Sequence, residues 1–308
     1  MNTVTRRRFL HSSFWAGTSL ALGTASAAAI EPIRRSGPPH LRLSIAAYSF
    51  RQSLVDYQHK AKAGKTKPAM TLDDFIDLAA GLDLDAVELT AYYFPQTTPD
   101  YLAHLKGRCT RLGLDISGTA VGNNFCVADA DKLREQIDAV KRWIEHSARL
   151  GAKTMRIFAG TVAKNDSEDK ARSRCIAAIQ EACDHAAKYG VYLALENHGG
   201  ITSTAEQVLA LVKAVKHDWF GVNLDTGNFR TDDPYGDLEK IAPYAVTVQI
   251  KTEIQRRGRK KEEADLKRLI DILRAVRYRG YVALEYEAAE DAHTAVPRHI
   301  EALKKWVR

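Results

Sequence analysis

Residues 192–200 read Tyr-Leu-Ala-Leu-Glu-Asn-His-Gly-Gly, and this stretch decides the fold. Polar and apolar residues alternate along it, which predicts a β-strand with one packed face and with Glu196 and His198 on the other face. The two glycines that follow end the strand and allow a tight turn. Because a buried carboxylate or imidazole is costly without a partner, we expect other polar groups close to this strand end.

Three later strand-like stretches also carry polar residues two positions apart near their ends. These pairs are Asn223 with Asp225, Gln249 with Lys251, and Glu285 with Glu287. Because side chains two residues apart on a strand point to the same side, the members of each pair are expected to face inward together. Four neighbouring strands that bring acids and an amide to one point predict a site for a divalent metal ion.

Strand-like and helix-like stretches alternate along the chain from residue 41 onward. The predicted strands cover residues 43–50, 86–94, 115–122, 154–160, 192–200, 220–228, 245–254 and 281–288. The predicted helices cover residues 72–82, 99–112, 131–150, 168–189, 204–216, 262–276 and 292–307, with a short connection at 237–242. This count and size match an α/β protein with a single (β/α)8 TIM barrel at residues 41–308. A doubly wound sheet would show a Gly-rich phosphate loop after the first strand, and residues 48–51, Tyr-Ser-Phe-Arg, do not form one.

The composition excludes several classes of partner. The chain of 308 residues has an ordinary apolar content of 45% and a formal net charge of +7. Part of this charge lies in Arg6, Arg7 and Arg8, and the rest is too diffuse to predict binding of nucleic acid or an anionic membrane. One basic cluster at residues 256–261 lies in a predicted loop, where it is either solvated or forms a collar that attracts an anionic substrate. The four cysteines show no Cys-x-x-Cys spacing, and we interpret them as free, mostly buried thiols.

The N-terminus carries a targeting pattern. Residues 5–10, Thr-Arg-Arg-Arg-Phe-Leu, precede a modest apolar stretch and then small residues at 25–29. This pattern resembles a twin-arginine export signal. We therefore predict a signal peptide at residues 1–29, a proline-containing tether at 30–40, and export to the periplasm or beyond by the twin-arginine translocase. The apolar stretch is too short to span a membrane, so no membrane span is expected in the mature protein.

Four motifs, taken in order and spacing, resemble the xylose isomerase-like TIM-barrel superfamily. They are Glu-Asn-His-Gly-Gly at 196–200, Asp-Thr-Gly-Asn at 225–228, Gln-Ile-Lys at 249–251 and Glu-Tyr-Glu at 285–287. The superfamily includes sugar phosphate isomerases and epimerases, inosose dehydratases and relatives of endonuclease IV. The resemblance covers nearly the whole chain after the signal. It implies metal ligands at Glu196, Asp225, Gln249 and Glu285, with Gln249 at a position where histidine is most common.

The resemblance also implies a chemistry. A ligand set dominated by oxygen favours Mn²⁺ or Mg²⁺ over Co²⁺ or Zn²⁺. One such ion would polarise the carbonyl of a sugar or keto-sugar and stabilise an enediolate. Glu196 and Glu285 would exchange the proton with carbon, Lys251 would stabilise the oxyanion, and His198 would act as acid or base, contact a hydroxyl, or hydrogen-bond a metal ligand. The predicted substrate-binding residues are Glu88, Asn123, Asn228 and Tyr48, and Glu88 has a structural role inside the barrel as its alternative.

The sequence leaves alternatives to an isomerase or epimerase open. Ketose 3-epimerases of this superfamily usually carry histidine three residues after the metal-binding aspartate, where this chain has Asn228. That departure keeps open β-elimination from a 3-keto-glycoside by a lyase or dehydratase with the same enolate, and also a sugar-binding barrel without catalysis. An AP endonuclease is disfavoured because the additional histidines of its three-metal cluster are missing and because export removes the protein from the genome. An oligomer is compatible with the sequence.

Overall fold

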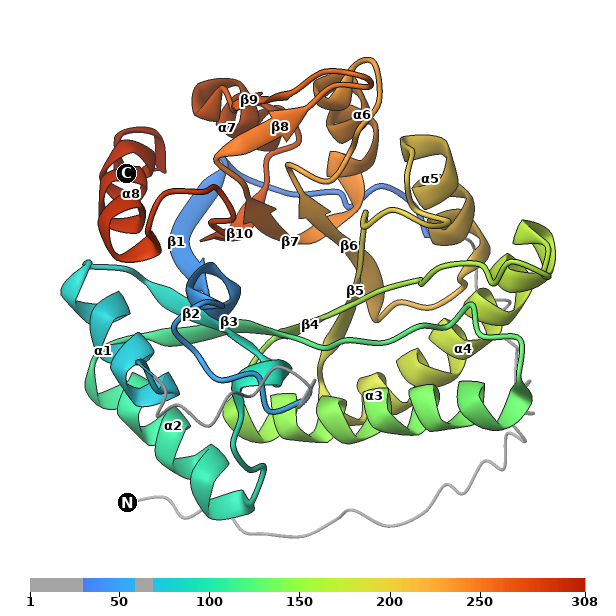
Figure 1. The fold of residues 1–308 in the computed structure, drawn as a ribbon, viewed down its shortest axis with the longest axis horizontal. Coiled ribbons are helices and arrows are strands. Elements are labelled where there is room, and N and C mark those ends of the chain that lie inside the picture. The colour runs from blue at the N-terminus through green and yellow to red at the C-terminus, as the bar shows by residue number, and fades with distance from the viewer. Residues whose placement is uncertain (1–29, 59–68, 308) are drawn as a thin grey trace, which may run out of the picture.

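The structure, a computed structural model, describes residues 30–58 and 69–307. In these residues, eight parallel strands form a closed barrel in the order β1-β2-β3-β4-β5-β6-β7-β10, and the helices surround it (Figure 1). The predicted (β/α)8 barrel is therefore confirmed. The predicted signal peptide at residues 1–29 lies outside the described residues.

The barrel strands end earlier than the sequence predicted. Their bounds are β1 (His40–Ala46), β2 (Ala86–Thr90), β3 (Asp115–Ala120), β4 (Thr154–Ile157), β5 (Tyr192–Glu196), β6 (Phe220–Asp225), β7 (Ala245–Ile250) and β10 (Arg279–Leu284). At the end of β5, the side-chain amide of Asn197 donates to the backbone oxygen of Asp225 and accepts from its backbone nitrogen, both at 2.9 Å. This side-chain bridge replaces the backbone ladder, so the strand stops there and the following residues turn across the mouth of the barrel.

The helices follow their predicted positions closely. Their bounds are α1 (Leu72–Gly81), α2 (Pro99–Arg111), α3 (Ala130–Leu150), α4 (Glu168–Tyr189), α5 (Ala205–Ala214), α6 (Pro234–Ile241), α7 (Leu266–Ala275) and α8 (Ala292–Val307). Thr71 and Thr204 form capping boxes at the starts of α1 and α5. Gly151 and Gly190 end α3 and α4 with φ of 82° and 68°, a conformation in which a side chain is strained. The short loops that result place each helix against its neighbouring strands.

A small hairpin between β7 and α7 corrects two predictions. Residues 245–254 were predicted as one strand and residues 262–276 as a helix, but β8 (Glu253–Gln255) and β9 (Lys261–Glu263) form an antiparallel pair between them. The helix begins only after Asp265, whose carboxylate accepts from the backbone nitrogen of Arg268 at 2.9 Å. The basic cluster therefore forms the turn of this hairpin and the first residue of its second strand.

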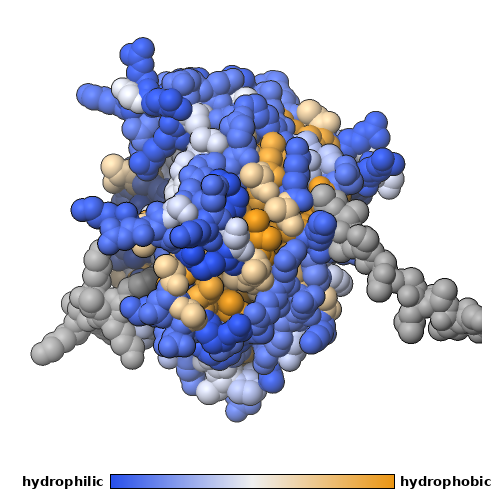
Figure 2. Space-filling view, turned by 90° about the vertical axis from the view of Figure 1, so that its right-hand side faces the viewer, coloured by the Kyte–Doolittle hydropathy of each residue, from blue (hydrophilic) through white to orange (hydrophobic). Residues whose placement is uncertain are grey.

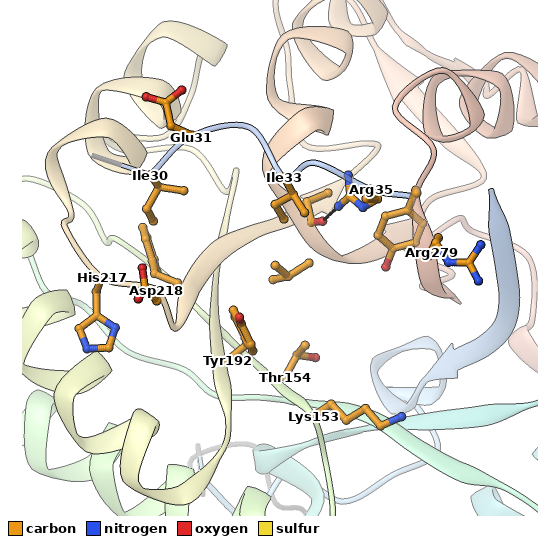
Figure 3. A pocket seen from close by; sticks show the side chains of 14 residues that line it. Ile30, Glu31, Ile33, Arg35, Lys153, Thr154, Tyr192, His217, Asp218 and Arg279 are labelled. Carbon is orange, nitrogen blue, oxygen red and sulfur yellow. Dashed lines mark hydrogen bonds between the residues drawn. The ribbon is translucent and has the colours of Figure 1, made fainter. Parts of the chain in front are cut away.

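The opposite end of the barrel is partly covered by the residues predicted as a tether. The backbone nitrogen of Ile33 donates to the oxygen of Pro243 at 3.0 Å, and Arg35 donates to the carbonyls of Ala245 and Val276. This segment borders a cavity of about 590 Å³ at the N-terminal ends of the strands (Figure 3). Ile33 and Arg35 thus hold the predicted tether against the barrel, while most of residues 30–39 are exposed.

The outer surface is mainly polar. Figure 2 shows hydrophilic residues over most of one face, with a band of hydrophobic residues between them. The four cysteines are buried and free, as predicted. In the part of the chain that the structure describes, no helix combines the length and apolar character needed to cross a membrane.

Candidate active site at the barrel mouth

The predicted site residues gather where the strands end, around a mouth cavity of about 260 Å³. Its lining residues are Tyr48, Asp56, Tyr92, Arg156, Phe158, Glu196, His198, Lys251, Glu285 and Glu287. The parallel strands put their carboxyl ends at one face of the barrel, and this is where such folds hold their active sites. The cavity is small and mainly polar, which suits a small polar ligand.

Lys251 is the central cation of the mouth cavity. Its Nζ lies 2.6 Å from Glu287, 2.7 Å from Glu285 and 3.4 Å from Asp225, measured to one carboxylate oxygen of each. The residue is only 6% exposed. Burial alone would lower the pKa of Lys251, but these three carboxylates outweigh burial and raise it well above its ordinary value. Lys251 therefore remains an ammonium ion inside the site.

Glu196 forms a second charged cluster across the cavity. Its Oε2 lies 2.9 Å from Nε of the buried Arg156, and its Oε1 accepts a 2.8 Å hydrogen bond from the amide of Asn228. Burial raises the pKa of Glu196, while Arg156 opposes that rise. The guanidinium of Arg156 also donates to the carbonyl of Val121 at 2.9 Å, so its position is fixed by the barrel wall.

Gln249 links Glu285 of the Lys251 cluster to Glu88 and Asn223 inside the barrel. Its Oε1 accepts from Asn223 at 2.6 Å, and its Nε2 donates to Glu88 at 2.7 Å and to Glu285 at 3.4 Å. Both ends of the Gln249 amide are therefore used inside the barrel, and the residue is fully buried. Glu88 does not line the mouth cavity, and its side-chain partner is the amide of Gln249 inside the barrel.

Two carboxyl groups of this network have a pKa that is raised above its ordinary value. Burial raises the pKa of Glu88 to about 7, and the nearby Glu285 adds to the rise. Burial also raises the pKa of Asp225 to about 7, although Lys251 opposes it. The Oδ1 atom of Asp225 accepts from the backbone nitrogen of Gly227 at 2.8 Å. These two groups can carry protons near neutral pH, which reduces the excess of negative charge around the two cations.

Three further predicted residues lie in different positions. The ring of His198 packs against Phe158 with centroids 4.3 Å apart, and its side chain is 53% exposed at the cavity edge. Burial of the ring lowers the pKa of His198, with Arg156 and Lys251 adding to the effect. Tyr48 lines the cavity as predicted. Asn123 does not line it, because its amide donates to the oxygen of Phe158 at 2.7 Å and accepts from its nitrogen at 2.8 Å.

The predicted metal ligands are already bound to the chain's own cations. Lys251 contacts Glu285, and Arg156 contacts Glu196. Gln249 presents its NH₂ group to Glu285, and an amide NH₂ group does not coordinate a cation. In the described part of the chain, no three His, Cys, Asp or Glu side chains form a group that could hold a metal ion. The residues in this arrangement do not fit the predicted divalent ion.

Sequence reasoning missed Asp56, Arg156 and Phe158, which line the mouth cavity, and a role for Glu287. Arg156 is the single charged residue in β4, and a lone arginine in a strand that is otherwise buried signals a carboxylate partner. Glu287 follows Glu285 at a spacing of two, which was noted without a function. Its pKa is lowered: burial would raise it, but Lys251, and then Arg51, outweigh burial.

The fold and this arrangement define a TIM barrel with a small cavity, lined by four carboxylates, at the carboxyl ends of its strands. The family described as "Xylose isomerase-like TIM barrel" matches residues 76–306, and the chain belongs to this family. No individually curated protein matches the chain.

Solved structures of similar fold include sugar epimerases. D-Psicose 3-epimerase from Clostridium cellulolyticum H10, solved with D-tagatose, has a TM-score of 0.69 and 17% identity over 87% of this chain and 98% of that one. A 3-keto-D-glucoside 4-epimerase from E. coli has a TM-score of 0.63 and 17% identity over 76% and 94%. A xylose isomerase-like barrel protein from Mycobacterium smegmatis, in complex with magnesium, has a TM-score of 0.65 and 18% identity over 87% and 98%. At these identities, the similarity establishes the fold.

Proposed function

We propose that the protein is an isomerase or epimerase of a sugar or keto-sugar that works through an enediolate in the mouth cavity. The observation that carries this proposal is the placement of Glu196 and Glu285 on the cavity lining, with the Lys251 ammonium 2.7 Å from Glu285. Membership of the family and the epimerases among the similar structures support it.

The chemistry follows from these groups. A carboxylate, Glu196 or Glu285, takes a proton from the carbon next to the carbonyl, and the electron pair moves to the carbonyl oxygen. The ammonium of Lys251 donates a hydrogen bond to this oxygen as its negative charge develops. Return of the proton to the opposite face of the same carbon gives an epimer. Return to the former carbonyl carbon, with a matching shift of the hydroxyl proton, gives an isomer. His198 lies at the cavity edge, where it can exchange a hydroxyl proton.

The metal ion implied by the resemblance is not part of this proposal. Mn²⁺ at Glu196, Asp225, Gln249 and Glu285 remains a prediction from the sequence. Lys251 and Arg156, which contact these carboxylates, place two positive charges in the site without an added ion.

A panel of substrates tests the proposed function. Ketoses and 3-keto-glycosides would be incubated with the purified protein, and the products identified by NMR. A new isomer or epimer is the expected result. A product that has lost its β-substituent would instead assign the elimination reaction, which shares the enolate. Binding of a sugar without any product from the panel would favour the sugar-binding barrel.

We also propose that the protein is exported. The support is the arginine pattern at residues 5–10 and the small residues at 25–29. Cell fractionation should find the protein outside the cytoplasm, and replacement of Arg6, Arg7 and Arg8 by lysine should retain it inside. Wild-type protein found only in the cytoplasm would contradict export.

A further inference from the structure

A second cavity of about 440 Å³ adjoins the mouth cavity and has the opposite charge character. We name it the basic chamber; its lining residues are His198, Gly199, Ser203, Thr204, Asn228, Arg230, Thr231 and Arg257. Two of these are arginines, and none of the eight is an aspartate or glutamate. The mouth cavity, by contrast, is lined by four carboxylates and by two cations, Arg156 and Lys251, which are paired with three of them. A ligand that reaches both cavities therefore meets an excess of acidic groups at one end and basic groups alone at the other.

Two residues join the cavities. His198 lines both of them. Asn228 lines the basic chamber, and its amide donates to Glu196 in the mouth cavity at 2.8 Å. Only the side chain of Asn228 therefore separates the basic chamber from Glu196, the carboxylate that is proposed to move the proton. A sugar whose reacting carbons lie against Glu196 can extend a substituent past Asn228 and His198 into the chamber.

Thr231 is an unpartnered polar group in the chamber wall. The residue is 8% exposed, and its Oγ1 is buried without a hydrogen-bond partner among the described residues. A buried hydroxyl that makes no hydrogen bond is destabilising. Rotation of this side chain would let an oxygen of a ligand in the chamber accept the hydrogen bond. Thr231 thus leaves one hydroxyl in the chamber wall that the described residues do not satisfy.

The two arginines keep their charge available for a ligand. Arg230 makes no hydrogen bond or ion pair with any described residue. Arg257 has one acidic neighbour, the exposed Asp232, with 3.7 Å between Nη1 and Oδ2. Exposed pairs at such a distance contribute little. The backbone nitrogen of Arg257 donates to the oxygen of Thr231 at 2.9 Å, so the hairpin turn is fixed to the chamber wall.

The basic residues of the hairpin differ in what they contact. Arg256 pairs with Glu262, and Lys261 pairs with Glu253 at 3.2 Å, so these two charges are neutralised within the hairpin. Arg257 instead lines the chamber. Gly258 has a φ of 68°, which lets the turn bend directly after Arg257. Two roles were considered for residues 256–261, a solvated loop and a collar that attracts an anionic substrate. This arrangement favours the collar.

We propose that the basic chamber binds the anionic group, a carboxylate or a phosphate, of the sugar that reacts in the mouth cavity. The substrate class is therefore an acidic sugar, and this inference rests on the proposed function. The guanidinium groups of Arg230 and Arg257 bind the anion, and Thr231 donates to one of its oxygens. The two cations of the mouth are already paired with carboxylates, so the anion binds better in the chamber, and this fixes the direction in which the sugar enters.

Calorimetric binding measurements on the full chain test the basic chamber without requiring turnover. The probes are glucuronate, glucose 6-phosphate and glucose, and the variants are Arg230→Met, Arg257→Met and Thr231→Val. At least one acidic sugar should bind wild-type protein more tightly than glucose does, and each arginine variant should weaken that binding by about tenfold. Comparison of the two acidic probes identifies a carboxylate or a phosphate as the preferred group.

Matched controls separate the chamber from general charge effects. Arg259→Met removes a charge from the same hairpin at a residue that does not line the chamber, and it should leave binding unchanged. Thr231→Val should weaken binding without lowering the melting temperature, because the hydroxyl has no partner to lose. Equal binding of glucose and both acidic sugars, or equal losses in Arg230→Met and Arg259→Met, would overturn the proposal. Acidic-sugar binding that meets these criteria without any turnover would retain the chamber and remove the proposed reaction.

Discussion

The two ends of the barrel hold cavities that differ in size and in chemistry. The cavity at the N-terminal ends of the strands is larger, about 590 Å³ against about 260 Å³ at the mouth. Figure 3 shows it bordered by Ile30, Ile33, Arg35 and Tyr192, among others. The guanidinium of Arg35 is occupied by backbone carbonyls, whereas the mouth keeps carboxylates and an ammonium on its cavity surface.

This difference shows that volume does not locate the reaction. At the N-terminal end, Arg35 and Arg279 stabilise the segment that partly covers the barrel. At the mouth, charged groups are buried at a cost that stability alone does not explain, because apolar residues of similar volume are often as stable or more stable there. Charged groups retained under those conditions indicate function. The following predictions test this contrast, from the largest expected effect to the smallest.

The largest effect is expected at the mouth. Glu285→Gln removes a carboxylate that faces the cavity, so turnover of the identified substrate should fall by about a thousandfold. Glu31→Gln makes the same chemical change on the lining of the opposite cavity and should leave turnover unchanged. Circular dichroism and the melting temperature would verify that both variants fold. Turnover retained in Glu285→Gln would remove this residue from the mechanism.

The next effect concerns stability and pH. Glu88 has a pKa of about 7 in the folded protein against an ordinary value of 4.5. Between these values the folded protein keeps a proton that the unfolded chain has lost, so stability falls as pH rises through this interval. The contribution of Glu88 to this fall is about 3 kcal/mol. Urea unfolding at several pH values should therefore show a flatter profile for Glu88→Gln than for wild type. Identical profiles would show that the proton is not on Glu88.

A smaller effect is expected in metal binding. If Lys251 occupies the cation position, its removal should increase the affinity of the site for Mn²⁺. Lys251→Met should bind Mn²⁺ about tenfold more tightly than wild type, since the lost ammonium no longer repels the ion and frees Asp225 and Glu285. Electron paramagnetic resonance of free Mn²⁺ measures this directly. Tighter binding by the wild type would support the metal ligands implied by the family resemblance and contradict the role given to Lys251.

The smallest effect is expected at the N-terminal end of the barrel. Ile33 is 36% exposed and packs where the N-terminal segment covers the strands. Ile33→Ala should lower the free energy of unfolding by about 1 kcal/mol and leave kcat/KM unchanged, because the residue only contributes packing. Chemical unfolding and steady-state kinetics test the two parts. A large loss of activity would contradict the view that the N-terminal end of the barrel contributes only to stability.

The barrel and most of its acidic residues could be predicted from the sequence because both follow from periodicity. Alternation placed Glu196, Asp225 and Glu285 on strand ends, and the barrel brings parallel strand ends to one face. The contacts of these residues could not be predicted in the same way. Lys251 reaches Asp225 at the end of β6 and both Glu285 and Glu287 after β10, and such a convergence depends on barrel closure rather than on local sequence.

Side-chain partners also explain the residues whose roles changed. Asn123 lies at a strand end like a substrate contact, but its amide is used by the backbone of Phe158. Arg156 was overlooked because a single charge in a short strand has no periodic signal. The β8–β9 hairpin interrupted a stretch that was predicted as strand and then helix, since pairing of the chain with itself outweighs local propensity. The sequence predicted where these residues lie along the strands, and the structure shows which groups their side chains contact.

Exchange of solvent deuterium tests the central claim, that the mouth cavity moves a proton at the carbon beside a carbonyl. The substrate identified from the panel would be incubated with wild-type protein and with Glu285→Gln in D₂O, and followed by NMR. The account predicts that deuterium appears at that carbon with wild-type protein and is largely absent with the variant. A product formed by the wild type with only protium at that carbon would contradict the account.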